Sequence, residues 1–218
     1  MSRVDLLSSQ RGYRLFAPVY DLVFGLSLRQ GRRLAIAALE ARPGDRVLEI
    51  GIGSGISLPL YPHDISVIGI DTSNEMLARA RQRIEQQKLG QRHTLLQMDV
   101  ENMSFVDASF DMAIMMYSVS GFPDPVRALT EVQRVCKPGA TLVVVNRFLS
   151  QGPLMRFFDG LLSPIYRLLR YRADLALDTL VENAGLEILE QKPTNLFGYS
   201  TVLVCRGRGP TSSRPRQP

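Results

Sequence analysis

Glycines and acidic residues stand at positions where they could hold a small ligand. The stretch VLEIGIGSG places Glu49 two residues before Gly51, and Gly53 and Gly55 follow at alternate positions. A glycine turn directly after a strand lets the backbone approach a ligand closely and opens the next helix toward it. Asp71 comes twenty residues after Gly51. This spacing indicates a ligand that needs both backbone contacts and carboxylates.

The glycine loop does not fit a dinucleotide. A pyrophosphate site prefers G-x-G-x-x-G, whose third glycine packs helix against strand, but Ile56 occupies that position. The carboxylate of Glu49 would repel a pyrophosphate, whereas it could attract a positively charged ligand or support the loop by hydrogen bonds. The pattern therefore favours a cationic nucleoside over a nicotinamide dinucleotide.

Polar side chains also close three later strand candidates. A carboxylate at Asp71 can accept both hydroxyls of a ribose. Asp99 closes the next candidate within reach of an adenine edge, and Tyr117 closes the fourth, where the topological switch of the sheet would place the reacting group. One such acid alone is more often a helix cap or a turn residue. Several acids at successive strands, together with the glycine loop, indicate a binding site.

Strand and helix patterns alternate along most of the chain. Short apolar runs predict strands at 46–50, 66–71, 93–99, 112–117, 141–146, 186–191 and 200–206. Helical spacing follows Ser73 and Pro125, and it recurs at 174–184 before Gly185. Because most of these strand runs are continuously apolar, they predict an α/β fold with a mostly parallel sheet and helices on both faces.

Basic charge is concentrated at the flanks of this alternating region. Residues 1–35 and 147–173 each carry a net charge of +4 and residues 207–218 carry +3, which leaves the rest of the chain at −6. Two segments, 12–31 and 148–171, are rich in Leu, Phe and Tyr with interspersed Arg. Such segments can lie in an anionic membrane interface, or their apolar stripes can simply pack on the core.

Composition and cysteine content exclude several classes of protein. The 218 residues are 45% hydrophobic and 22% charged, which is ordinary for a soluble globular chain. No apolar run reaches the roughly 18 to 20 residues of a membrane-spanning helix, and the N-terminus lacks the apolar core of a signal peptide, so we expect a cytoplasmic protein. Cys136 and Cys205 lie in apolar stretches, which predicts neither a disulfide framework nor a metal site.

Taken together, these motifs resemble the class I S-adenosylmethionine-dependent methyltransferases. The similarity is firm over 45–146 and extends to 206, and it rests on Glu49–Gly55, Asp71, Met98-Asp99, Ser109–Asp111 and Lys137–Gly139. It implies a Rossmann-like, seven-stranded, mostly parallel sheet with a reversed final hairpin. It also implies S-adenosylmethionine as the cofactor and S-adenosylhomocysteine as the product.

The resemblance further implies a domain division and a set of site residues. We expect one methyltransferase domain over 1–206, with helical lid segments at 1–35 and 148–173 and a disordered basic tail at 207–218. The glycines would line the methionine part of the cofactor, Glu49 its ammonium group, and Asp71 its ribose. Adenine would be bordered by Thr72 and Met76, and Asp99 would take its amino group. The full cofactor-binding set is Glu49, Gly51, Gly53, Gly55, Asp71, Thr72, Met76, Asp99, Val100 and Tyr117.

The flanks resemble small bacterial phospholipid N-methyltransferases, which methylate phosphatidylethanolamine stepwise toward phosphatidylcholine. The similarity lies in APVYDLVFG at 17–25, RQGRR at 29–33 and VNRF at 145–148. Arg147 departs from that pattern, because histidine is frequent there, and this leaves the exact acceptor lipid open. The resemblance implies a phospholipid substrate. With the basic flanks, we expect a monomer that is bound peripherally to the inner, anionic face of the membrane.

Candidates for the catalytic groups come from both flanks and from the sheet edge. Tyr20, Tyr117 and Asn146 could orient the amine, and Arg147 could bind the lipid phosphate, although either tyrosine could be a wall residue. The alternative acceptors are a quinone-like or other small molecule and another amino-lipid. A noncatalytic cofactor-binding protein is the alternative class. Nucleic acid is not an expected partner, since the basic residues lie among Leu and Phe.

Overall fold

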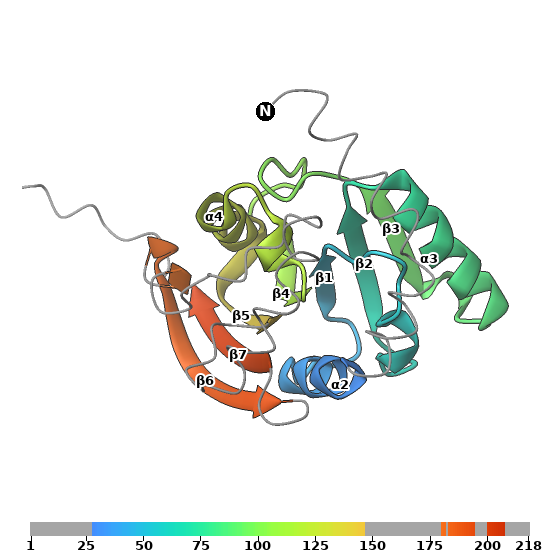
Figure 1. Ribbon diagram of the computed structural model, residues 1–218, viewed down its shortest axis with the longest axis horizontal. Helices are drawn as coiled ribbons and strands as arrows, with labels where there is room; N and C mark the ends of the chain where they lie inside the picture. The colour runs from blue at the N-terminus through green and yellow to red at the C-terminus, as the bar shows by residue number, and fades with distance from the viewer. Residues whose placement is uncertain (1–27, 147–179, 182, 195–199, 208–218) are drawn as a thin grey trace, which may run out of the picture.

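The described elements are arranged around a single twisted sheet of seven strands (Figure 1). The computed structural model describes residues 28–146, 180–181, 183–194 and 200–207. In chain order the elements are α2 (Arg29–Ala38), β1 (Arg46–Ile50), η1 (Leu58–Leu60), β2 (Ser66–Asp71), α3 (Asn74–Gln86), η2 (Gly90–Arg92), β3 (His93–Gln97), β4 (Phe110–Met116), η3 (Val119–Gly121), α4 (Pro125–Val135), β5 (Cys136–Asn146), β6 (Leu186–Thr194) and β7 (Ser200–Gly207).

The strand order is β3-β2-β1-β4-β5-β7-β6. The pairs from β3 to β5 are parallel, and β7 is antiparallel to both β5 and β6. The Rossmann-like, mostly parallel sheet with a reversed final hairpin is therefore confirmed. The chain moves outward in opposite directions from β1 and β4, so the topological switch lies between these two strands, and ligands in such sheets bind at the carboxyl side of the switch.

Helices cover both faces of the sheet, as predicted. Buried residues of α4 pack with Leu48 and Leu142 on one face. On the other face α2 packs with Val47 and Val143, and α3 contributes Leu77 to a smaller cluster beside it. Alternate residues of β1 and β5 thus face opposite cores, which is why apolar residues stand next to one another in both strands.

Local signals account for the helix starts that frame the site. Ser73 is the N-cap of α3, and its hydroxyl accepts a hydrogen bond from the Met76 amide at 3.3 Å. Asp124 caps α4 in the same way, with Pro125 at the first helical turn. Side-chain oxygens at these positions satisfy amides that have no partner within the helix. The carboxyl edge of the sheet therefore receives two well-defined helix N-termini.

The structure changes several predicted boundaries. β3 ends at Gln97, so Asp99 lies two residues beyond the strand rather than at its end. β5 begins at Cys136, and the Lys137–Gly139 motif lies inside an irregular stretch of the strand where the register with β4 shifts. Gly139 has φ +77°, a left-handed conformation that suits glycine. The Lys137–Gly139 motif is therefore an irregular part of the strand and not a turn before it.

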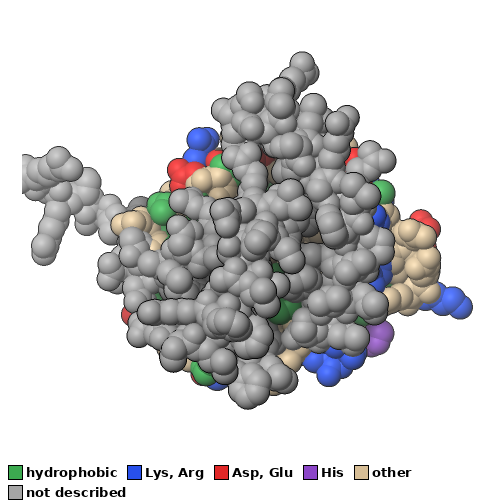
Figure 2. Space-filling view, in the orientation of Figure 1, with side chains coloured by type: hydrophobic (Ala, Val, Ile, Leu, Met, Phe, Trp, Pro, Cys, Tyr) green, Lys and Arg blue, Asp and Glu red, His purple; other side chains and the backbone are tan. Residues whose placement is uncertain are grey.

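The predicted domain division and lid segments stay predictions, because residues 1–27, 147–179 and 208–218 lie outside the described residues. Of the predicted helix at 174–184, the described residues Leu180 and Val181 are helical and buried. In the described ranges no helix has the length and apolarity needed to cross a membrane. Around the rim of the face seen in Figure 2, described acidic and basic side chains are both visible, without one dominant sign.

Candidate active site

The glycine loop lies at the topological switch, between the end of β1 and η1. Gly51, Gly53 and Gly55 have φ values of +68°, +56° and +69°, all in the left-handed region. A side chain at Gly51 would overlap Ser118, and one at Gly55 would press on Leu58 and Ala80. The space next to Gly53 is open. Gly53 is therefore the point of the loop where a bound molecule can approach the backbone most closely.

Asp71 ties the end of β2 to this loop. Its Oδ2 accepts a hydrogen bond from the Gly53 amide at 2.9 Å, and its Oδ1 accepts one from the Ser73 amide at 2.8 Å. Burial raises the pKa of Asp71, while these amide donors act to lower it. Each carboxylate oxygen can accept a second hydrogen bond. The arrangement can hold the loop and bind a diol beside it at the same time.

The residues predicted to border adenine lie along the same edge. The amide of Met98 donates to the Asp71 carbonyl at 3.0 Å, which brings the end of β3 beside the end of β2. Thr72 is exposed and Met76 half-buried at the start of α3. Asp99 is exposed, and its Oδ1 accepts from the Glu101 amide at 2.9 Å, while Val100 is buried. Asp99 therefore shapes the turn after β3, and its predicted bond to adenine stays a prediction.

Glu49 lies beneath the loop, where it is only 2% exposed. The Ser57 hydroxyl donates to Oε1 at 2.6 Å and the Tyr61 hydroxyl to Oε2 at 2.9 Å. Burial raises the pKa of Glu49 to about 7, although these two donors and the charge of Arg32 act in the opposite direction. Of the two roles that the sequence left open, these bonds show the support of the loop. A contact with the ammonium group of the cofactor stays a prediction.

Tyr117 follows β4 directly and has a left-handed backbone, with φ +59°. Its amide donates to the Val145 carbonyl at 2.7 Å, which fixes it beside the end of β5. Asn146, the last residue of β5, is fully buried at the same edge. The structure thus brings two of the four predicted catalytic residues together. The other two, Tyr20 and Arg147, lie outside the described residues.

Sequence reasoning missed Arg32 as a residue of this edge. Arg32 belongs to the basic run at 29–33, yet it is only 8% exposed. Its guanidinium carbon lies 5.2 Å from the centroid of the Tyr117 ring. The spacing of the sequence indicates this burial, because Arg32 falls on the apolar face of the helix. The residues of that face are all buried: Leu28, Arg32, Ala35, Ile36 and Leu39.

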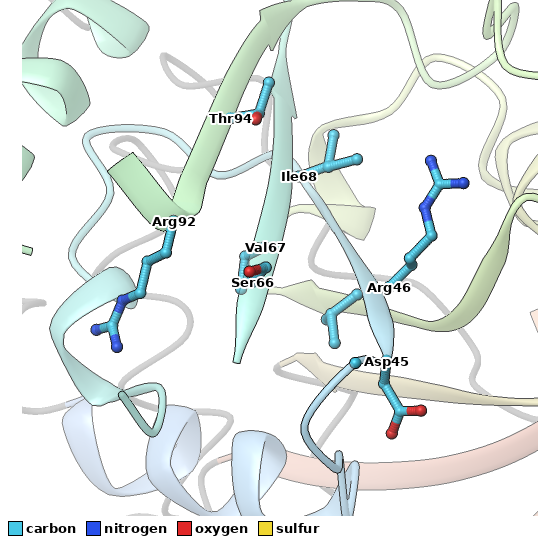
Figure 3. Close-up of a pocket in the computed structure, with 9 residues that line it drawn as sticks. Asp45, Arg46, Ser66, Val67, Ile68, Arg92 and Thr94 are labelled. Carbon is cyan, nitrogen blue, oxygen red and sulfur yellow. The ribbon is translucent and has the colours of Figure 1, made fainter. Parts of the chain in front are cut away.

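A separate hollow lies at the opposite edge of the sheet (Figure 3). It has a volume of about 320 Å³ and is lined by the amino ends of β1, β2 and β3. In Figure 3 the side chains of Arg46 and Arg92 extend away from one another. Because parallel sheets bind ligands at their carboxyl edge, this hollow is not the candidate active site.

The carboxyl edge fits S-adenosylmethionine better than a phosphate-bearing cofactor. Gly53 leaves open space against the loop, and Asp71 presents oxygens beside it. Glu49 adds a second carboxyl group below. Acidic groups attract a sulfonium and an ammonium and accept from ribose hydroxyls, whereas they repel a pyrophosphate. Among the described side chains there is no cluster of three or more metal-ligating residues.

Comparisons with known proteins agree with this geometry. A family model described as a methyltransferase domain matches residues 48–144. The chain is 39% identical over 206 residues to a phosphatidylethanolamine N-methyltransferase of Cereibacter sphaeroides, covering 94% of this chain and 100% of that protein. It is 34% identical over 152 residues to a 2-phytyl-1,4-naphtoquinone methyltransferase of Synechococcus elongatus, covering 66% of this chain and 65% of that protein.

Solved structures share the fold. The chain is similar to an S-adenosylmethionine-dependent methyltransferase of Thermotoga maritima, with a TM-score of 0.68 and 24% identity over 91% of this chain and 99% of the other. It is also similar to such an enzyme of Aquifex aeolicus, with a TM-score of 0.65 and 18% identity over 90% of this chain and 97% of the other. At these identities the likeness concerns the fold alone.

Proposed function

Since this chain belongs to the class I S-adenosylmethionine-dependent methyltransferases, we propose that it methylates the amine head group of phosphatidylethanolamine at a membrane surface. The reaction would proceed stepwise through the mono- and dimethylated lipids to phosphatidylcholine. The cofactor is S-adenosylmethionine, and S-adenosylhomocysteine is the product of each transfer. The enzyme would act as a monomer, bound peripherally to the cytoplasmic face.

The observation that carries this proposal is the extent of similarity. The match to the phosphatidylethanolamine N-methyltransferase spans 94% of this chain and all of that protein, so it includes both basic flanks. The match to the naphtoquinone methyltransferase spans 66% of this chain. In this fold the flanks supply acceptor specificity, since the sheet edge holds the cofactor. Similarity that continues through the flanks therefore favours the lipid acceptor.

The described residues define what the chain itself contributes to the reaction. When bound, S-adenosylmethionine supplies an electrophilic methyl group on a sulfonium. Asp71 and the open face of Gly53 would hold and orient that ligand. We assign Tyr117 and Asn146 to orienting the amine, whose lone pair must be free of its proton before attack. Alignment of two reactants in this way supplies much of the rate in such displacements.

A direct assay tests the proposed acceptor. Labelled S-adenosylmethionine is incubated with the enzyme and mixed vesicles of phosphatidylethanolamine and an anionic lipid, and the products are separated by head group. We expect mono-, di- and trimethylated lipids. The same assay with a demethylated naphthoquinone tests the second candidate, which the 34% identity to the naphtoquinone methyltransferase favours. Quinone methylation without lipid methylation would replace the proposal.

Two exposed arginines on α2 should contribute to membrane binding. Arg29 and Arg33 are exposed, whereas the intervening Arg32 is buried and does not belong to this surface. An exposed arginine near an anionic bilayer contributes about 1 kcal/mol. Replacing both Arg29 and Arg33 with glutamine should therefore weaken sedimentation with anionic vesicles by roughly thirtyfold in affinity.

A matched variant separates local contact from net charge. Arg81 and Lys88 are exposed residues of α3 and its C-terminal turn, and replacing both with glutamine removes the same charge. This variant should bind vesicles nearly as well as the wild type. Equal losses in the two double variants would show that overall charge, rather than the surface of α2, attracts the membrane.

A further inference from the structure

Arg32 is a buried cation in a helix that otherwise packs apolar side chains on the sheet. It lies on the inner face of α2, which packs against β4, β5 and β7. At 8% exposure the residue has lost most of its contact with water. Burying a charge is unfavourable unless specific partners compensate for it. The partners of Arg32 therefore indicate what keeps it there.

Two partners of Arg32 lie on opposite sides of the topological switch. On the β4 side its guanidinium carbon is 5.2 Å from the centroid of the Tyr117 ring, which is within the range of a cation–π interaction. On the β1 side its charge acts on the buried carboxyl group of Glu49. Glu49 is itself held by Ser57 and Tyr61. Arg32 thus connects the support of the glycine loop to Tyr117.

Tyr117 needs such support because its backbone is strained. A bulky residue with φ +59° is unfavourable and persists only where its surroundings hold it. Such residues gather at functional sites. The next residue, Ser118, lies against Gly51, and its hydroxyl donates to the Ile50 carbonyl at 3.0 Å. The residue that follows Tyr117 is therefore anchored beside the glycine loop.

We propose that Arg32 is a positioning residue for methyl transfer, which acts by stacking on the ring of Tyr117 and holding it at the switch of the sheet. This inference rests on the proposed role of Tyr117 in orienting the acceptor. In this role Arg32 would act through Tyr117 and not by contact with either reactant. The charge of Arg32 also acts on the buried carboxyl group of Glu49, which gives the guanidinium an electrostatic partner besides the ring.

Kinetics of Arg32→Met with phosphatidylethanolamine vesicles test the proposal. We expect kcat to fall about tenfold, because a misplaced Tyr117 would no longer align the bound amine with the methyl group. The KM for lipid and the affinity for S-adenosylhomocysteine should change little. The control is Arg42→Met, which makes the same chemical change at an exposed residue beyond α2 and should keep wild-type kcat.

Further variants distinguish stacking from charge and from general structure. Arg32→Lys keeps a positive charge beside Glu49 but loses the planar group, and it should remain impaired. In Tyr117→Phe the ring persists, so Arg32→Met should cause the same loss as in the wild type. In Tyr117→Leu the ring is absent, so adding Arg32→Met should cause little further loss. If Arg32→Met does not fold, the lysine variant carries the same comparison.

Each outcome decides one question. A kcat for Arg32→Met equal to the wild type, full activity of Arg32→Lys, or additive losses of Arg32→Met and Tyr117→Leu would overturn the role of Arg32. A wild-type enzyme that binds S-adenosylhomocysteine but methylates no lipid would refute the proposed acceptor instead. The two failures are therefore distinguishable within one set of assays.

Discussion

Replacing Asp71 with alanine is expected to weaken the binding of S-adenosylmethionine by at least about a hundredfold, since each hydrogen bond to a charged group contributes roughly 1.5 to 3 kcal/mol. In the structure Asp71 holds the Gly53 and Ser73 amides. In the bound state we expect it to accept the ribose hydroxyls as well. The variant loses both the shape of the loop and the acceptor for the diol. Titration calorimetry with S-adenosylhomocysteine measures the effect.

Two further variants show whether the loss belongs to the carboxylate. Asp71→Asn keeps one acceptor oxygen of similar size, so its loss should lie between the wild type and the alanine variant. Asp64→Ala removes an exposed carboxylate from the turn before β2 and should leave the affinity unchanged. Wild-type affinity in Asp71→Ala would mean that the ribose is bound elsewhere, and the assignment of this strand end would be wrong.

The second large effect concerns the pH dependence of stability through Glu49. Burial raises its pKa from 4.5 to about 7 in the folded protein. Between these two values the folded state binds more protons than the unfolded state, so this residue makes stability fall as pH rises. The total contribution is about 3 kcal/mol. Above pH 7 the full penalty is present, and below pH 4.5 it is absent.

Glu49→Gln should remove this slope. Urea unfolding between pH 4.5 and 8 measures the free energy of unfolding of both proteins. Relative to the wild type, the glutamine variant should gain about 3 kcal/mol of stability as pH rises through this range. The difference is needed because His93 acts oppositely: burial lowers its pKa to about 4, so its contribution to stability grows with rising pH. Glu85→Gln, at an exposed residue of α3, is the control. A pH-independent difference would show that folding does not raise the pKa of Glu49.

The carboxyl edge illustrates what can be predicted from local sequence. Glycines at alternate positions after an apolar run, and acids after successive runs, have few structural explanations other than a ligand site at strand ends. The strand 66–71 and the cap at Ser73 agree with the prediction residue by residue. Such features depend on the period of apolar residues and on local hydrogen bonds, both of which act over a few neighbours.

Glu49 shows where this kind of prediction stops. Its type and position predicted a carboxylate at the loop, and both roles considered for it were compatible with the sequence. Only the packing of η1 against β1 brings Ser57 and Tyr61 to its two oxygens. The direction of a side chain at a strand end depends on which residues from other parts of the chain pack around it. A short segment of sequence does not show which residues these are.

The sequence by itself determined the sheet, the order of its glycine and acidic motifs, and the family, because hydrophobic periodicity and backbone freedom act locally. The tertiary structure decided that Arg32 is buried against Tyr117, that Lys137–Gly139 is an irregular part of β5, and that Glu49 lies under the loop. These outcomes depend on contacts of α2 with β4, of β5 with β4, and of the residues beside η1 with β1, which only the assembled fold brings together. Charge counts grouped Arg32 with the basic segment at 1–35, whereas packing buried it beside the ring of Tyr117.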